Sequence, residues 1–121
     1  MPYGFEQADW DAAKKQAYLA MTDRARVRGM ITYSELTAKI TAIRLEPDSY
    51  ALADLLGEIS SAEDAAGRGM LSVIVVHKTG DMEPGRGFYT LAATLGKSID
   101  DRVAFWVSEL HRVHATWSKN A

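Results

Sequence analysis

The sequence contains no cysteine, and this absence excludes three kinds of chemistry. A disulfide framework, a zinc site with thiolate ligands and a thiol nucleophile all need that side chain. There is also no apolar run near the ~20 residues that an α-helix needs to span a bilayer. The first residues have neither the basic region nor the apolar core of a signal peptide. We therefore expect a cytoplasmic protein that makes no membrane contact.

A surplus of basic residues is lacking as well. Lys and Arg number 14 against 16 Asp and Glu, so the formal net charge is −2. A protein of this charge has no overall attraction to nucleic acid, and such binding would need a local basic patch. The 121 residues are enough for one ordinary core, and no linker, repeat or low-complexity segment divides them. We expect one domain over residues 1–121.

The middle of the chain carries the most distinctive pattern. Apolar and β-branched residues dominate 70–76, which predicts a buried strand. A glycine-rich polar loop follows at 77–87. Apolar residues return at helical spacing from Phe88, and Gly96 stands where that helix would stop. Polar loops held at both ends often carry sites. The titratable residues of this loop are His77, Lys78, Asp81, Glu83 and Arg86.

Start signals predict helices before this stretch. Asp9 is placed to cap a first helix over 9–28. Thr32 and Glu35 have the spacing of a capping box, which predicts a second helix. A third helix is expected over 48–65, with Pro47 and Asp48 suited to its first turn. Its apolar stripe is formed by Leu52, Leu55, Leu56 and Ile59.

A capping signature at 98–101 predicts the last helix, which has the strongest amphipathic pattern in the chain. Aromatic residues at helical spacing usually pack inward, so we expect its apolar stripe to face the core. We expect His111 and His114 on the flank, as surface residues, because no third metal ligand is in view. The stripe consists of Val103, Trp106, Val107, Leu110, Val113 and Trp117.

The predicted fold class is α+β and mainly helical. The order is helix, short strand, helix, helix, strand, polar loop, helix, helix. This order is that of a winged helix-turn-helix domain with a small sheet, a glycine-rich wing loop and a long C-terminal amphipathic helix. The second strand of the wing would have to lie within 82–89, where no strand pattern is evident.

Three motifs resemble the C-terminal domain of DNA alkylguanine alkyltransferases and the alkyltransferase-like proteins. Residues 31–36 are similar to that family's Thr-Tyr-Gly-Glu-Leu helix start. Residues 53–57 are similar to its Ala-Arg-Ala-Val-Gly recognition segment, and 74–78 to its Ile-Pro-Cys-His-Arg. The glycine-rich loop and Phe88 resemble the Gly-Gly-Tyr beyond. The stretch 71–91 is also similar to a pattern of small bacterial proteins.

Two departures from the family pattern remove its chemistry. Val76 stands where the family has its reactive cysteine, so alkyl transfer lacks a sulfur nucleophile. Asp54, of opposite charge, stands where the family has its base-displacing arginine. The resemblance then implies the scaffold and groove binding near Tyr33 and Ser34, without a reaction. We expect no catalytic residue, no cofactor and no metal.

The leading hypothesis is a non-catalytic DNA-binding or DNA-associated winged-helix-like protein of bacterial type, with double-stranded DNA as its partner. Basic and polar side chains would contact phosphates and make binding depend on salt. The helix over 48–65 opposes this reading because it has several acids and no Lys or Arg. The expected contact residues are Arg24, Arg26, Arg28, Tyr33, Ser34, His77, Lys78 and Arg86.

Two other readings stay open. In the first, the chain is a protein-interaction module, such as an immunity, antitoxin or regulatory subunit, that presents Asp54, Glu58, Glu63 and Asp64 to a basic partner. In the second, it is a metal-dependent nuclease in which Glu58 holds Mg²⁺ and Lys78 stabilises charge. His77 beside Asp81 or Glu83 is a further candidate general base. The constellation for catalysis is incomplete, and nothing in the sequence indicates an oligomeric state.

Overall fold

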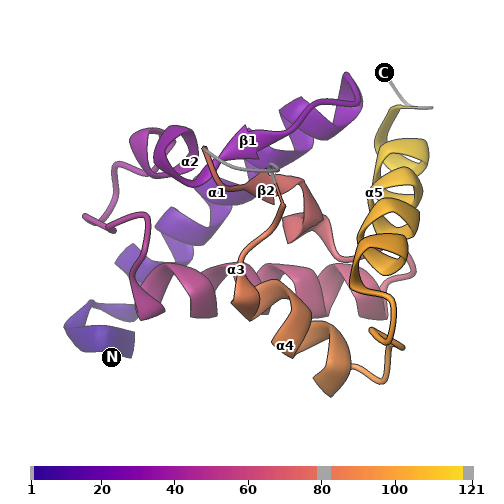
Figure 1. The fold of residues 1–121 in the computed structure, drawn as a ribbon. Helices are drawn as coiled ribbons and strands as arrows, with labels where there is room; N and C mark the ends of the chain where they lie inside the picture. Colours follow the sequence, from indigo (N-terminus) through magenta and orange to yellow (C-terminus); the bar gives the residue numbers. More distant parts are fainter. Residues whose placement is uncertain (1, 79–82, 119–121) are drawn as a thin grey trace.

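The computed structural model describes residues 2–78 and 83–118. It is mainly helical with one small sheet, which confirms the α+β class (Figure 1). No helix within these residues is both long and apolar enough to cross a bilayer. The elements are η1 (Pro2–Gly4), α1 (Gln7–Arg26), β1 (Ile31–Thr32), α2 (Tyr33–Lys39), α3 (Tyr50–Ala65), η2 (Leu71–Ile74), β2 (Val75–Val76), α4 (Arg86–Thr94) and α5 (Arg102–Ser118).

The sheet has two short parallel strands. Ile31 of β1 lies opposite Val75 of β2, and Thr32 lies opposite Val76. The sheet therefore joins the chain before α2 to the chain before the glycine-rich loop. No strand is present in 83–89, so the described part of the chain does not show the second wing strand. The winged-helix arrangement stays a prediction.

The strand predicted over 70–76 is correct only for β2. Leu71–Ile74 forms the 3₁₀ helix η2 instead, so the prediction was wrong there. The backbone N–H of Ser72 donates to the hydroxyl of Ser60, 2.9 Å away, and the N–H of Val73 donates to the carbonyl of Met70. These bonds give the backbone partners that a sheet would otherwise supply. The predicted burial of the run is confirmed.

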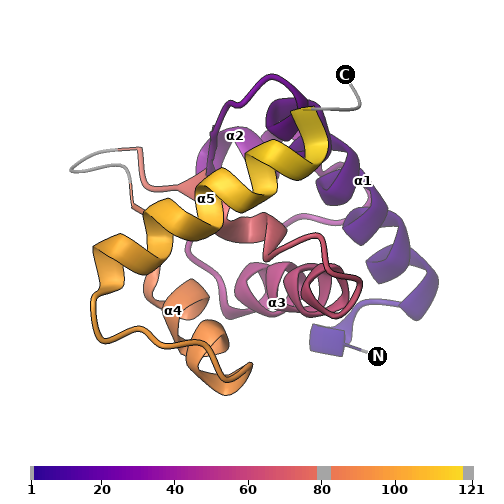
Figure 2. The same ribbon diagram turned by 90° about the vertical axis from the view of Figure 1, so that its right-hand side faces the viewer.

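The core lies between α1, α3, η2 and α5, and η2 is held between α3 and α5 (Figure 2). Helix α1 contributes Trp10 and Met21 together with two alanines, Ala13 and Ala17, all fully buried. Small alanine side chains let the neighbouring elements approach the α1 backbone closely. The predicted stripe of α3 also faces this core, with Leu52, Leu55, Leu56 and Ile59 all buried.

The helix starts confirm one predicted cap, correct another and shift the start of α3. Thr32 and Glu35 form the expected reciprocal capping box at α2. Helix α1 begins at Gln7, so Asp9 lies inside its first turn and the prediction that it caps the helix was wrong. Helix α3 begins at Tyr50, later than predicted, because the Ser49 hydroxyl accepts the N–H of Leu52 and acts as the cap.

The inward face of α5 follows the predicted stripe in part, since Val113 is in the core and Trp106, Leu110 and Trp117 pack against it. Val103 and Val107 are 52% and 40% exposed, so the prediction was wrong for both. Val113 is buried as expected, but its buried neighbours are Glu109 and His114. The helix is turned so that these polar side chains reach inward, and two specific hydrogen bonds hold it in that rotation.

Those bonds explain why polar residues displace valines from the core. The Glu109 carboxylate accepts the backbone N–H of Met70 at 2.7 Å, and His114 Nε2 lies 2.9 Å from the carbonyl oxygen of Gly29. A buried backbone group without a partner costs about 1–3 kcal/mol, comparable with the gain from burying a valine. The prediction that His114 is a surface residue was wrong, whereas His111 is exposed.

Candidate functional site

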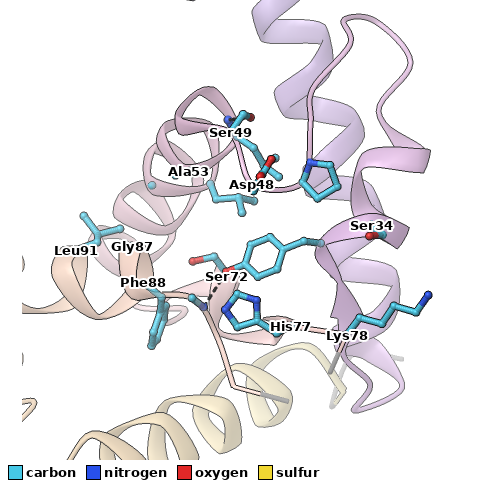
Figure 3. A pocket seen from close by; sticks show the side chains of 16 residues that line it. Ser34, Asp48, Ser49, Ala53, Ser72, His77, Lys78, Gly87, Phe88 and Leu91 are labelled. Atoms are coloured by element: carbon cyan, nitrogen blue, oxygen red, sulfur yellow. Dashed lines mark hydrogen bonds between the residues drawn. The ribbon is translucent and has the colours of Figure 1, made fainter. Parts of the chain in front are cut away.

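A pocket of about 390 Å³ opens between the start of α2, the loop before α3, and α4 (Figure 3). We call it the α2–α4 pocket. Its size falls in the range of small-molecule sites, which combine apolar walls with a few polar groups. The apolar wall consists of Pro47, Leu52, Ala53, Leu56, Phe88 and Leu91. The polar side chains are those of Tyr33, Ser34, Asp48, Ser49, Ser72, His77 and Lys78.

The register of the sheet brings Tyr33 and His77 together. Tyr33 follows Thr32, His77 follows Val76, and Thr32 pairs with Val76 in the parallel sheet. Residues that follow paired parallel strands leave the sheet at the same edge. The two rings lie accordingly at the pocket, with centroids 5.3 Å apart and planes tilted by 40°.

The Tyr33 hydroxyl is fixed by the backbone of Gly85, whose N–H donates to it at 2.9 Å. A Cβ atom at position 85 would lie 2.8 Å from that hydroxyl, so only glycine allows this approach. Burial raises the pKa of Tyr33 above its ordinary value of 10.0, and the hydrogen bond from Gly85 lowers it by less. The phenol is therefore neutral near pH 7. Its oxygen accepts from Gly85, and its proton is left for donation into the pocket.

His77 and Lys78 stand on the exposed side of the pocket. The N–H of His77 donates to the carbonyl of Glu83 at 3.0 Å, which closes the base of the glycine-rich loop. Asp81, the other acid considered as a partner for His77, lies outside the described residues. The Glu83 carboxylate instead accepts a hydrogen bond from the Tyr89 hydroxyl.

The predicted basic contacts at the end of α1 do not reach this pocket. Arg24 donates to the carbonyl of Met30 at 2.7 Å and to Glu35. Arg26 is paired with Asp23, and its guanidinium lies 5.5 Å from the ring centroid of Trp117. Arg28 is exposed, at the turn after α1. Of the eight predicted contact residues, the pocket thus unites Tyr33, Ser34, His77 and Lys78, and Arg86 lines a separate groove.

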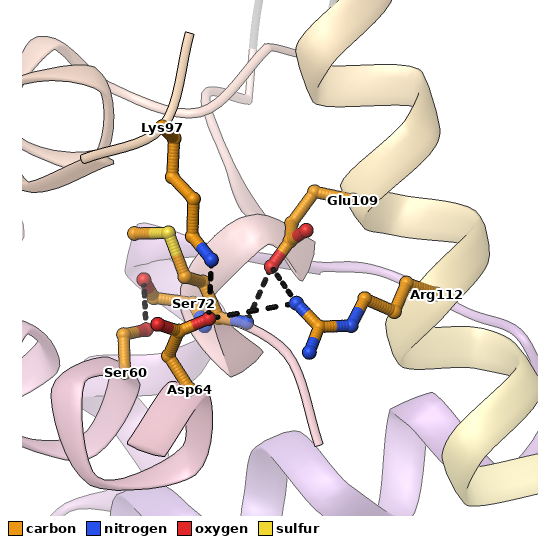
Figure 4. A network of polar contacts seen from close by, with 7 residues as sticks. Ser60, Asp64, Ser72, Lys97, Glu109 and Arg112 are labelled. Atoms are coloured by element: carbon orange, nitrogen blue, oxygen red, sulfur yellow. Dashed lines mark hydrogen bonds and ion pairs between the residues drawn. The ribbon is translucent and has the colours of Figure 1, made fainter. Parts of the chain in front are cut away.

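The acids of α3 do not form one continuous surface. Asp54 and Glu58 are exposed, but Glu63 is only 2% exposed and is paired with Arg68. Asp64 is paired with Lys97 at 2.9 Å and with Arg112 (Figure 4). The expectation that Glu63 and Asp64 face a partner is therefore corrected, since both carboxylates are largely covered and are paired with side chains of the same chain.

The acid proposed as a metal ligand is already engaged by other side chains. The Glu58 carboxylate accepts from the indole N–H of Trp10 at 3.2 Å and is paired with Lys14 at 3.0 Å. It does not line the α2–α4 pocket with Lys78. Among residues 2–78 and 83–118, no group of three or more His, Cys, Asp or Glu side chains is placed to hold a metal ion.

Sequence reasoning missed Gly85 and Ser72 as parts of the site. Gly85 belongs to the glycine-rich loop, and the absence of a side chain there admits the Tyr33 hydroxyl. Pairing the ends of the two predicted strands in parallel would have placed Tyr33 beside His77. Comparison with known proteins adds nothing to the site, because no family model, curated protein or solved structure matches the chain.

Proposed function

We propose that this chain is a non-catalytic, winged-helix-like protein that associates with DNA, and that the α2–α4 pocket receives one unstacked base. The observation that carries the proposal is the make-up of the pocket. An apolar wall faces a neutral tyrosine hydroxyl with a proton to donate, and His77 and Lys78 stand on its exposed side. A planar ring with hydrogen-bond acceptors on its edge matches these surfaces.

The apolar wall supports a base taken out of the stack. Stacking and burial of a base against aromatic or apolar side chains is worth about 1–3 kcal/mol. Phe88 and Leu91 of α4 line the pocket together with Leu52 and Leu56 of α3, so a ring would meet apolar surface from both helices. Tyr33 would then donate to an acceptor on the edge of the ring.

Phosphate contacts fit the exposed rim. Lys78 and Ser34 are both exposed there, and Lys78 has no ion pair within the described residues. Such contacts position a strand without reading its sequence. Asp54, an exposed acid of α3, would repel a backbone lying along the outer side of that helix. We therefore assign DNA contact to the pocket rim and not to the outer face of α3.

Binding without reaction agrees with the residue at the end of β2. Val76 is fully buried and has no nucleophilic atom. The titratable side chains that line the pocket are those of Tyr33, Asp48, His77 and Lys78. These groups can hold a ligand by hydrogen bonds and charge.

Fluorescence anisotropy at low salt tests the proposal with two labelled duplexes, one fully paired and one with an unpaired base. We expect tighter binding to the second. Tyr33→Phe should weaken that binding about three- to tenfold, as for loss of one neutral hydrogen bond. Lys78→Gln should weaken binding to both duplexes, whereas Lys15→Gln, an exposed change on α1, should not. Absence of binding to either duplex below about 100 μM, the non-specific range, would remove the proposal.

A second candidate function rests on the outer face of α3. Tyr50 is 87% exposed, and Asp54 lies one turn further along the helix. An exposed aromatic beside acids is suited to a basic protein surface. The variant Asp54→Lys distinguishes the two functions, because it should change the two binding affinities in opposite directions. The change should strengthen DNA binding by removing repulsion, whereas it should abolish capture of a basic protein.

A further inference from the structure

A second groove, of about 600 Å³, lies on the other side of Gly85, between α4 and the start of α5. We call it the α4–α5 groove. It shares only His77 with the α2–α4 pocket. One face of α4 contributes Arg86, Thr90 and Thr94, which are spaced one helical turn apart, and α5 contributes Arg102 at its first residue. Arg86, Thr90 and Arg102 thus bring N–H or O–H donors to one concavity, whereas the Thr94 hydroxyl donates to the carbonyl of Thr90 at 3.1 Å.

Arg102 is held in place by two neighbours. Its guanidinium carbon lies 5.0 Å from the ring centroid of Tyr89, and its Nε lies 3.6 Å from the Glu83 carboxylate. The Tyr89 hydroxyl donates to the same Glu83 oxygen at 2.8 Å. The carboxylate is mostly covered, whereas the Arg102 side chain remains 60% exposed. The planar guanidinium is thus oriented while its terminal N–H groups stay accessible to a ligand.

Arg86 adds an unneutralised charge. It is exposed at the start of α4 and has no ion pair within residues 2–78 and 83–118. The groove therefore carries two guanidinium groups against the single Glu83 carboxylate. Guanidinium groups bind phosphate oxygens through paired hydrogen bonds, and the Thr90 hydroxyl adds a further donor. Pro84, Ala93 and Ile99 give the groove an apolar side suited to the sugar of a sugar phosphate.

We propose that the α4–α5 groove is a phosphate-binding site, with Arg86 and Arg102 as the anion ligands. This goes beyond the proposed base pocket and does not require it, because the two cavities share one residue only. The phosphate is either a monoester, as in a free nucleotide, or a diester within a nucleic-acid strand. Both present oxygens of the same chemistry, and the ligand that binds identifies the source.

The test uses isothermal titration of the full chain with ribose 5-phosphate and with a short single-stranded oligonucleotide. Ribose 5-phosphate has no base, so its binding reports on the groove and not on the α2–α4 pocket. Binding of this sugar phosphate identifies a monoester site, and binding of the oligonucleotide alone identifies a diester site. In either case Arg86→Gln and Arg102→Gln should each weaken binding about tenfold, and Arg44→Gln, a highly exposed control, should not.

Arg86→Gln keeps the test decisive, because Arg86 makes no described ion pair and its loss should leave the melting temperature unchanged. Failure of both ligands to bind below about 1 mM would overturn the proposal, as would equal binding by both arginine variants and the wild type. A Tyr33→Phe background separates this site from the base pocket. Arg86→Gln should reduce the affinity for the phosphate ligand by the same factor in that background, whether or not Tyr33 takes part in binding a base.

Discussion

The Tyr33 hydroxyl accepts a hydrogen bond from the backbone N–H of Gly85, and this contact joins the start of α2 to the start of α4. The two residues are 52 positions apart in the chain. The parallel sheet provides the second link between the same regions, since β1 leads into Tyr33 and β2 leads into His77. The shape of the α2–α4 pocket therefore depends on one hydrogen bond and two short strands.

Gly85→Ala should damage this arrangement. The new methyl group would meet the Tyr33 hydroxyl at 2.8 Å and force one of them to move. Overpacking of this kind costs about 1–3 kcal/mol. We expect a lower free energy of unfolding in urea and weaker binding to the duplex with an unpaired base. The backbone at 85 has an ordinary extended conformation, so the effect would not come from strain in φ.

Gly57→Ala is the matched control. A Cβ there would lie 3.8 Å from Leu91, an ordinary contact, and position 57 is inside α3. Alanine favours a helix interior by about 1 kcal/mol over glycine, so this variant should be as stable as the wild type or more stable. Equal stability of the two alanine variants would contradict the close approach at Gly85.

Tyr33→Phe should alter stability at alkaline pH. The pKa of Tyr33 is raised by burial, so the unfolded chain releases this proton near its ordinary value of 10.0 before the folded chain does. The contribution of the neutral Tyr33 phenol to the free energy of unfolding is complete below pH 10, and it is lost as the pH rises through the folded pKa. The wild type should therefore lose stability more steeply above pH 10 than the variant. Urea unfolding at a series of pH values measures this, and parallel curves would refute it.

Burial patterns in the sequence predicted the fold better than they predicted backbone geometry. The stripe of α3 and the burial of 70–76 follow from the positions of apolar residues, because such residues are driven inward in either a helix or a strand. The 3₁₀ helix η2 does not follow from them. It depends on the Ser60 hydroxyl, which belongs to another element and replaces a sheet partner.

The capping box at α2 gives a prediction at acid pH. The pKa of Glu35 is lowered, first by the N–H of Thr32 and then by Arg24. Its contribution to stability is present above the ordinary value of 4.5 and is lost as the pH falls through the lower folded pKa. With Glu35→Gln, the free energy of unfolding should fall less steeply below pH 4.5 than it does in the wild type. A second variant tests the other half of the capping box. Thr32→Ala should lower the free energy of unfolding by about 1 kcal/mol at neutral pH, measured by urea unfolding. If Glu35→Gln loses stability below pH 4.5 as steeply as the wild type does, the stabilising role of the Glu35 carboxylate is contradicted.

Glu109→Ala should be strongly destabilising although it removes no apolar group. The change leaves the buried N–H of Met70 without its acceptor and removes a carboxylate beside Arg112. We expect a loss of about 1–3 kcal/mol. Glu109→Gln keeps an oxygen acceptor and should recover part of it. If both variants match the exposed control His111→Ala, the Glu109 bond does not hold α5 in place.

The rotation of α5 is tested by comparing two valines. Val113→Ala removes buried methyl groups and should cost about 2 kcal/mol, whereas Val103→Ala should stay within about 0.5 kcal/mol of the wild type. Thermal unfolding of the two variants measures the difference. If Val103→Ala were the more destabilising of the two, α5 would have the orientation expected from its apolar spacing alone.

Only part of the candidate site could be predicted from the sequence, because some of its contacts join residues that are far apart in the chain. Tyr33, Ser34, His77 and Lys78 were found because they sit at a helix start and a strand end. The ion pairs of Arg24 and Asp64 were not predicted, because they join positions that only the folded chain brings together. Charge in a sequence shows which groups are present, and packing decides whether they face a partner.

The most direct test of the proposed function is a two-dimensional amide NMR titration of the full chain with a duplex that carries one unpaired base. The account predicts the largest shifts at Gly85, His77 and Gly57, around the α2–α4 pocket, and their loss in Gly85→Ala. Shifts confined to Asp54 and Glu58 on the outer face of α3, or none at saturating duplex, would contradict it.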